Sequence, residues 1–141
     1  MAKQPHPRLP IAPADIDQVV VLFYARVRQH PVIGPLFMEA VGTGDSEWAE
    51  HEAKIASFWR NAMMIDREYQ GNPMRIHIAN DAIQPEHFPI WLGLFHETLM
   101  DCLDADLAES FFALASRIGR SMAMGIHASR SRPGGPPLLF G

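Results

Sequence analysis

Hydrophobic side chains recur three and four positions apart in four long segments of the chain, which is the spacing of amphipathic α-helices. Between these segments there is no strand-like alternation of useful length, no internal repeat, and no glycine-rich phosphate loop after a strand. The four stripes cover residues 16–27, 51–63, 88–102 and 107–122. The pattern predicts an all-α fold.

The ends of the first and last helices carry recognisable signals. The first helix is expected to start after Pro13, with Asp15 as its cap, and to run to about Gln29. The last one is expected to follow Asp104 as its cap and to end near His127. The helix that carries the third stripe should begin near residue 85. Prolines at 31 and 35 predict an irregular link with about one helical turn, in which Phe37 follows the second proline.

The second stripe differs from the others because a histidine stands at its head. His51 shares a helix face with apolar side chains, so it should point into the interior. The other members of this stripe are Ile55, Phe58, Trp59, Ala62 and Met63.

A second histidine follows after a break. Gly71 suits the C-terminal end of a helix, and Asn72-Pro73 resists helix continuation. The same two residues form an N-cap and a first helical position, which predicts a short helix over residues 74–80 with His77 near its middle. Two imidazoles so arranged are able to face one buried metal.

Spacing alone leaves the role of both histidines open. A histidine on an apolar helix face is commonly a hydrogen-bonded core residue rather than a ligand. Imidazole also suits iron, and a slot lined by bulky apolar and aromatic side chains suits a large planar cofactor. The pattern is compatible with such a cofactor and does not name it. The remaining histidines are assigned no chemistry: His6, His30, His87, His96 and His127.

Composition narrows the class of protein. A chain of 141 residues with 48% hydrophobic residues fits one globular domain. We place that domain at residues 13–129, between an N-terminal extension (1–12) and a disordered C-terminal tail (130–141). Because Cys102 is the only cysteine, no internal disulfide or cysteine-ligated cluster is possible. We interpret it as a small core residue.

Charge and hydropathy exclude further classes. The formal charge is −4 and the basic residues are scattered, so no nucleic-acid partner is expected. No apolar run approaches the length of a membrane span, and the polar start MAKQPHPRLP lacks the apolar centre of a secretory signal. A cytoplasmic protein without a membrane partner is therefore predicted.

Five motifs together resemble the group III truncated haemoglobins. They are FYxRV at 23–27, Phe37 after the proline-rich turn, HxxxIxxFW at 51–59, YxGNPxxxH at 69–77 and HFxxWLxLF at 87–95. The resemblance covers roughly residues 15–125. The only Gly-Gly pair lies in the tail at 134–135, which agrees with group III because the other two truncated groups have double-glycine motifs between helices.

The resemblance implies a globin-like fold, a truncated two-over-two helical sandwich around haem b. His77 would be the proximal iron ligand, with its other ring nitrogen donating to a backbone carbonyl such as that of Pro73. The opposite face would carry Tyr24, His51 and Trp91, and the Tyr24 hydroxyl and Trp91 indole would donate hydrogen bonds to a partly negative ligand.

Other residues are implied as the walls of this pocket. Phe37, Ile55 and Phe58 would close it, while Trp59 would be a packing residue first and a haem contact second. Lys54 and Arg75 would pair with the haem propionates, although exposed cations at such positions are ordinarily just solvated.

His51 has two possible roles at this stage. It would either swing between pocket and solvent as a gate for ligands or bind the iron as a sixth ligand. The sequence does not choose between them.

The function implied is binding of dioxygen and nitric oxide, and redox detoxification rather than bulk oxygen transport. A polar distal pocket stabilises charge that develops on bound oxygen, as nitric oxide dioxygenation or peroxidase-like chemistry requires. Turnover would need an unidentified reductase, because the chain has no flavin- or nicotinamide-binding motif. A monomer or weak dimer is expected.

Two alternatives remain. The protein would be a gas or redox sensor whose tail, ending Leu138-Leu139-Phe140, docks on a partner. Otherwise it would be a helical bundle without cofactor, in which both histidines are structural.

Overall fold

The computed structural model describes residues 9–66 and 84–131. Within these ranges the chain forms five helices and no strand, which confirms the all-α prediction. The helices are α1 (Pro13–Gln29), α2 (Ile33–Val41), α3 (Asp45–Ala62), α5 (His87–Cys102) and α6 (Ala105–Ser131).

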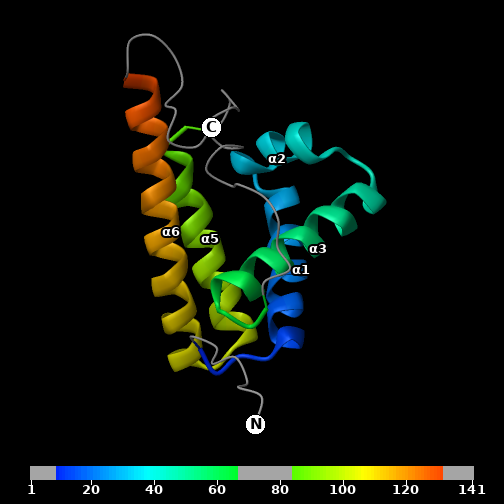
Figure 1. The fold of residues 1–141 in the computed structure, drawn as a ribbon. Helices are drawn as coiled ribbons and strands as arrows, with labels where there is room; N and C mark the ends of the chain where they lie inside the picture. Colours follow the sequence, from blue (N-terminus) through cyan, green and yellow to red (C-terminus); the bar gives the residue numbers. More distant parts are fainter. Residues whose placement is uncertain (1–8, 67–83, 132–141) are drawn as a thin grey trace.

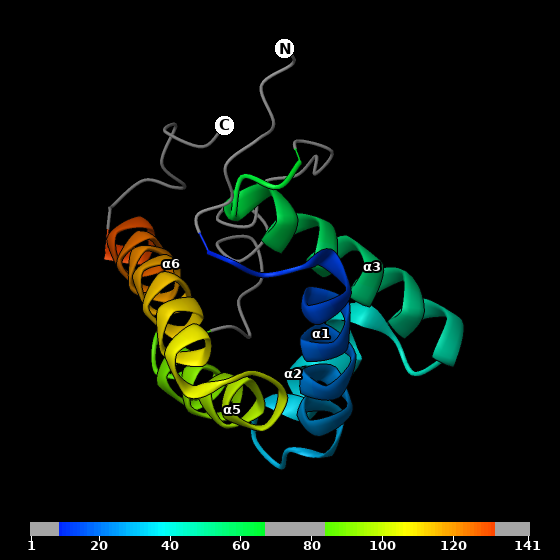
Figure 2. The ribbon, with the colours of Figure 1, turned by 90° about the horizontal axis from the view of Figure 1, so that it is seen from below.

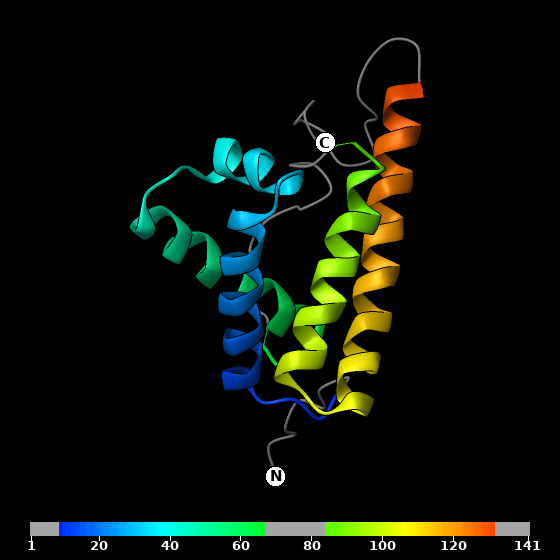
Figure 3. The ribbon, with the colours of Figure 1, turned by 180° about the vertical axis from the view of Figure 1, so that it is seen from behind.

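The helices form two pairs that pack on each other (Figure 1). Helices α5 and α6 run antiparallel, and α1 crosses α3 in the other pair (Figure 2). Helix α1 also packs along α5 and so joins the pairs, while α2 lies across one end of α1 (Figure 3). This arrangement is the predicted two-over-two sandwich.

Helix α1 buries the whole stripe that the sequence predicted, from Ile16 to Val27. Its start differs from the prediction, because the helix begins at Pro13 and Asp15 is not its cap. Proline is favoured at the first helical position since its φ is already helical and it has no N–H to satisfy. The Asp15 carboxylate instead reaches back from the first turn to accept the Ala12 N–H at 3.2 Å.

Helix α2 is longer than the single turn expected from its prolines. Pro35 falls in its first turn, where backbone N–H groups have no partner within the helix, so proline costs no hydrogen bond there. His30 stabilises this end: its Nδ1 accepts the N–H groups of Val32 and Ile33 at 3.1 and 3.3 Å. A histidine that was assigned no chemistry thus begins α2 and places Phe37.

The ends of α5 and α6 are defined by side chains. His87 Nδ1 accepts the Gln84 N–H at 2.9 Å just before α5, so the helix starts close to the predicted position. The Asp104 carboxylate accepts the Leu107 N–H at 3.0 Å, as expected for the cap of α6. Helix α6 continues to Ser131, beyond the predicted end near His127, and takes in the first two residues assigned to the tail.

The core between the two pairs is aromatic. The Trp59 ring of α3 stacks on Phe95 of α5, with centroids 5.5 Å apart, and meets Phe111 of α6 at 5.0 Å. All three side chains are at most 2% exposed. Trp59 therefore ties α3 to the α5/α6 pair, which agrees with its interpretation as a packing residue.

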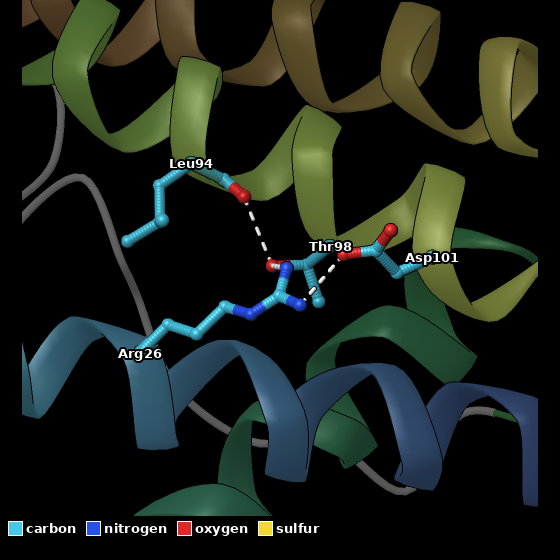
Figure 4. Close-up of polar contacts among 4 residues, drawn as sticks. All are labelled: Arg26, Leu94, Thr98 and Asp101. Carbon is cyan, nitrogen blue, oxygen red and sulfur yellow. Dashed lines mark hydrogen bonds and ion pairs between the residues drawn. The ribbon is translucent and has the colours of Figure 1, made fainter.

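One polar network links α1 to α5 (Figure 4). The Arg26 guanidinium donates to Thr98 Oγ1 at 3.2 Å and to Asp101 Oδ2 at 2.6 Å. The fully buried Thr98 hydroxyl in turn donates to the Leu94 carbonyl at 2.9 Å. The network satisfies a buried hydroxyl and fixes α1 against α5.

Several predictions lie outside the described residues. They are the break after Tyr69, the short helix with Arg75 and His77, and most of the two terminal segments. Among the described helices, none is long and apolar enough to cross a membrane.

Candidate functional site

Four rings from three helices meet at one side of α1, and we call them the aromatic cluster: Tyr24 of α1, Phe37 of α2, and Trp48 and His51 of α3. The Tyr24 and His51 rings meet edge to face with centroids 4.8 Å apart. Phe37 lies 5.7 Å from Tyr24 and 6.3 Å from His51. The structure thus brings together three side chains that the sequence assigned to one pocket.

His51 carries the most unusual atom of the cluster. Its Nε2 is buried and has no hydrogen-bond partner within residues 9–66 and 84–131. Burial, followed by the charge of Lys54, lowers the pKa of His51 to about 4. The imidazole is therefore neutral at pH 7, with one ring nitrogen able to donate and the other able to accept or bind a metal.

Tyr24 supplies a hydroxyl beside that imidazole. The side chain is 3% exposed. Its burial, and to a lesser degree the nearby Glu52 carboxylate, raise the pKa of Tyr24 far above its ordinary value. The phenol consequently keeps its proton throughout the physiological range and remains a hydrogen-bond donor.

Trp48 completes the cluster and was missed by the sequence analysis. Its ring is 1% exposed and lies 5.9 Å from Tyr24 and 5.7 Å from His51. The indole N–H donates to the Gly42 carbonyl at 2.8 Å. A signal was present, because Trp48 stands three residues before His51 and so extends the helical stripe by one turn.

Trp91 is linked to Tyr24 through the ring of Phe23. It stacks on Phe95 at 5.1 Å and meets the edge of Phe23 at 5.5 Å, and Phe23 in turn contacts Tyr24 at 5.0 Å. The side chain is half-buried, unlike its fully buried neighbours Phe23 and Phe95. Its indole is accordingly placed at the edge of the core rather than inside it.

Other apolar side chains near the cluster are also only partly covered. Phe37, Ile55 and Phe58 pack against the core yet are half-buried. Lys54 is exposed, and Arg75 and His77 lie outside the described residues.

The residues present fit a haem group. A large planar apolar cofactor would cover partly exposed aromatic side chains, and a small ligand bound to it would offer a partner to His51 Nε2, which has none in the part of the chain that the structure describes. This fit concerns the side of the haem that Tyr24 and His51 would face, because the predicted proximal ligand His77 lies outside the described residues.

Three of the histidines that were assigned no chemistry have structural roles. His30 and His87 accept backbone N–H groups at the starts of α2 and α5. His96 Nε2 lies 2.6 Å from Glu109 Oε1 and links α5 to α6. These three side chains therefore have hydrogen-bond partners outside the aromatic cluster.

Fold and site together define a two-over-two globin, and comparison with known proteins names its group. No protein-family model matches the chain. The group 3 truncated haemoglobin ctb of Campylobacter jejuni is 40% identical over 84 residues, which span 60% of this chain and 66% of that protein. A crystal structure of the group III truncated haemoglobin from Campylobacter jejuni matches with a TM-score of 0.78 and 32% identity, covering 81% of this chain and 90% of that chain. The chain belongs to the group III truncated haemoglobins, a family of haem-binding globins.

A second solved structure shares the fold. The 2/2 haemoglobin of Synechococcus sp. PCC 7002, in the cyanomet state with covalently attached haem, has a TM-score of 0.65 and 19% identity. It covers 80% of this chain and 92% of that chain. At this identity the likeness concerns the two-over-two architecture alone.

Proposed function

We propose that the chain binds haem b, with His77 as the proximal iron ligand and with Tyr24 and His51 facing the opposite side. The observation that carries this proposal is the buried His51 Nε2 next to the Tyr24 ring, an atom that has no hydrogen-bond partner among the described residues. A buried polar atom without a partner costs about 1–3 kcal/mol. A ligand in the pocket would remove that cost, whereas residues 9–66 and 84–131 by themselves offer the atom no partner.

Haem supplies an iron that binds small diatomic ligands and changes oxidation state. The chain contributes a protonated phenol and a neutral imidazole whose rings meet edge to face. Since both are shielded from water, their hydrogen bonds to a partly negative ligand are stronger than the same bonds in solvent. Trp91 is a further donor if its indole N–H turns toward the pocket, a role that stays a prediction.

The remaining contacts of the cofactor follow from side-chain type. Phe37, Ile55, Phe58 and Trp91 would pack on the porphyrin, with Trp59 behind them. Lys54 and Arg75 would pair with the propionates; Lys54 is exposed, as a cation that reaches a propionate at the haem edge must be.

We infer that the ligands are dioxygen and nitric oxide, and that the function is redox detoxification as a nitric oxide dioxygenase or a peroxidase-like enzyme. Two polar side chains on the distal side, Tyr24 and His51, favour tight retention of bound dioxygen. Tight retention hinders oxygen delivery and suits chemistry on the bound ligand. Turnover requires electrons from a separate reductase. The sensor alternative receives no support here, because its docking segment lies outside the described residues.

This function is tested by mixing the oxygenated protein with nitric oxide in a stopped-flow spectrometer. Rapid conversion to ferric haem with one nitrate per haem is expected. Slow conversion, or conversion without nitrate, would remove nitric oxide dioxygenation from consideration and leave peroxidase activity with an added reductant to be assayed.

A further inference from the structure

We propose that Trp48 is a positioning residue that sets where the Tyr24 hydroxyl and the His51 imidazole lie in the pocket. The proposal rests on the proposed function, since these two groups matter because they face the haem ligand. The connection between α2 and α3 carries neither Tyr24 nor His51, but through Trp48 it would influence how both of them bind the ligand.

Trp48 is anchored to that connection by its indole nitrogen. The N–H donates to the Gly42 carbonyl at 2.8 Å. Gly42 has φ 118° and ψ −177°, a conformation that glycine adopts without strain, and a Cβ there would collide with the Glu47 carboxylate. Glu47 also accepts the Gly44 N–H at 3.3 Å. The Glu47 side chain thus holds the connection against the first turn of α3, and the indole hydrogen bond anchors Trp48 to that connection.

A charged group covers Trp48 from α1. The Arg28 guanidinium lies 5.0 Å from the centre of the indole, within the range of a cation–π contact. Arg28 also pairs with Asp45 at 3.5 Å. Because Arg28 follows Tyr24 by one helical turn, the same face of α1 holds Trp48 in place and supplies the hydroxyl.

The other neighbours of the Trp48 ring are the two distal groups. Tyr24 and His51 lie 5.9 and 5.7 Å from it, and 4.8 Å from each other. The three rings form a triangle in which two members face the ligand and the third is tied to the backbone. A shift of Trp48 therefore opens space next to both distal groups at once.

The main test substitutes Trp48→Phe, which keeps an apolar ring and removes the anchoring N–H. The carbon monoxide complex of the haem-loaded protein reports distal hydrogen bonding through the infrared C–O stretch. A second readout does not need haem: the chain has two tyrosines, so ¹³C-tyrosine labelling gives two signals, and Tyr24→Phe identifies that of Tyr24.

We expect Trp48→Phe to shift the C–O stretch in the direction that Tyr24→Phe shifts it, and to move or broaden the Tyr24 signal. The dioxygen dissociation rate should rise about two- to threefold, since a weakened hydrogen bond loses part of an effect of about fivefold. In a Tyr24→Phe/His51→Ala background, Trp48→Phe should no longer shift the stretch. If Trp48→Phe shifts the C–O stretch in that background as much as it does alone, the proposal is overturned. The proposal is also overturned if Trp48→Phe by itself changes neither the C–O stretch nor the Tyr24 signal.

Two controls separate positioning from packing. Phe111→Leu, which removes a buried ring from α6, should lower the unfolding midpoint without moving either readout. Arg28→Met, which uncovers Trp48 and keeps it anchored, should move both readouts less than Trp48→Phe does, and Asp45→Asn should move neither. If Trp48→Phe does not fold, Arg28→Met replaces it as the test variant. Unchanged values of both readouts in Arg28→Met would then contradict the proposal.

Failure of the proposed function gives a different result. If the wild-type protein takes up no haem, the infrared experiment has no signal and the haem proposal fails. The Tyr24 signal still decides the role of Trp48: its movement in Trp48→Phe, but not in Phe111→Leu, supports positioning, and its constancy overturns it.

Discussion

The rings of Tyr24 and His51 meet edge to face, with their centroids 4.8 Å apart and their planes at 81°. The Tyr24 ring comes from α1 and the His51 ring from α3, so their contact stabilises the packing of these two helices. It also sets a buried, un-ionised phenol beside a half-buried, neutral imidazole whose Nε2 is buried and unpartnered in the described part of the chain. Ligand retention and pH dependence should both follow from this pair.

The substitution Tyr24→Phe should weaken ligand retention with little effect on folding. It removes a hydroxyl whose hydrogen bond is worth about 1 kcal/mol, so we expect the dioxygen dissociation rate to rise about fivefold. Stopped-flow displacement of dioxygen by carbon monoxide measures it. Thr98→Val, which removes a buried hydroxyl of α5 away from the cluster, is the matched control and should leave the rate unchanged. Equal rates in Tyr24→Phe and wild type would show that this hydroxyl does not reach the ligand.

His51 should make stability depend on pH in mildly acidic solution. Unfolded, its imidazole takes up a proton below about 6.5, whereas in the folded chain it does so only near 4. Protons therefore favour the unfolded state, and stability falls as the pH drops through this window. His51→Gln should flatten that part of the profile, measured as urea midpoints between pH 7 and about 4.5. The other six histidines are unchanged in this variant, and an unaltered slope would contradict the lowered pKa of His51.

The two roles left open for His51 are distinguished by His51→Ala. If the imidazole binds iron as a sixth ligand, a six-coordinate ferrous spectrum should become five-coordinate. If it gates the pocket instead, the spectrum should stay the same and carbon monoxide should associate faster, because a barrier to entry is removed. A spectrum and an association rate that both match the wild type would leave neither role standing.

The link between α1 and α5 should depend more on Thr98 than on Asp101. Thr98 is fully buried and its hydroxyl both accepts from Arg26 and donates to Leu94, so Thr98→Val should destabilise the fold by about 1–2 kcal/mol. The Asp101 carboxylate is 57% exposed, so Asp101→Asn should cost at most about 1 kcal/mol. Urea unfolding of both variants gives the comparison, and the reverse order would contradict it.

Much of the fold was predictable because its helices bury regular stripes. The periodicity of α1 identified the buried residues from Ile16 to Val27, and Asp104 marked the start of α6 correctly. The length of α2 was not predictable from its prolines. Pro35 looks like a helix breaker in sequence, and its harmless place in the first turn depends on where His30 begins the helix.

The site was predicted in part. Helical spacing directed His51 inward, and the family resemblance added Tyr24 and Phe37, which do lie beside it. Helical spacing places Trp48 on the His51 stripe, but its hydrogen bond to Gly42 depends on the path of a loop, so its anchoring was not predictable. Helical periodicity carries no information on such tertiary contacts.

The central claim is that this chain holds haem through His77, and the most direct test is the ultraviolet–visible spectrum of the wild type and His77→Ala. Spectra are recorded for the ferric, ferrous and carbon monoxide forms after reconstitution with haem. The account predicts haem bands in the wild type that His77→Ala abolishes or alters profoundly. Absence of bands in the wild type, or identical bands in the variant, would contradict it.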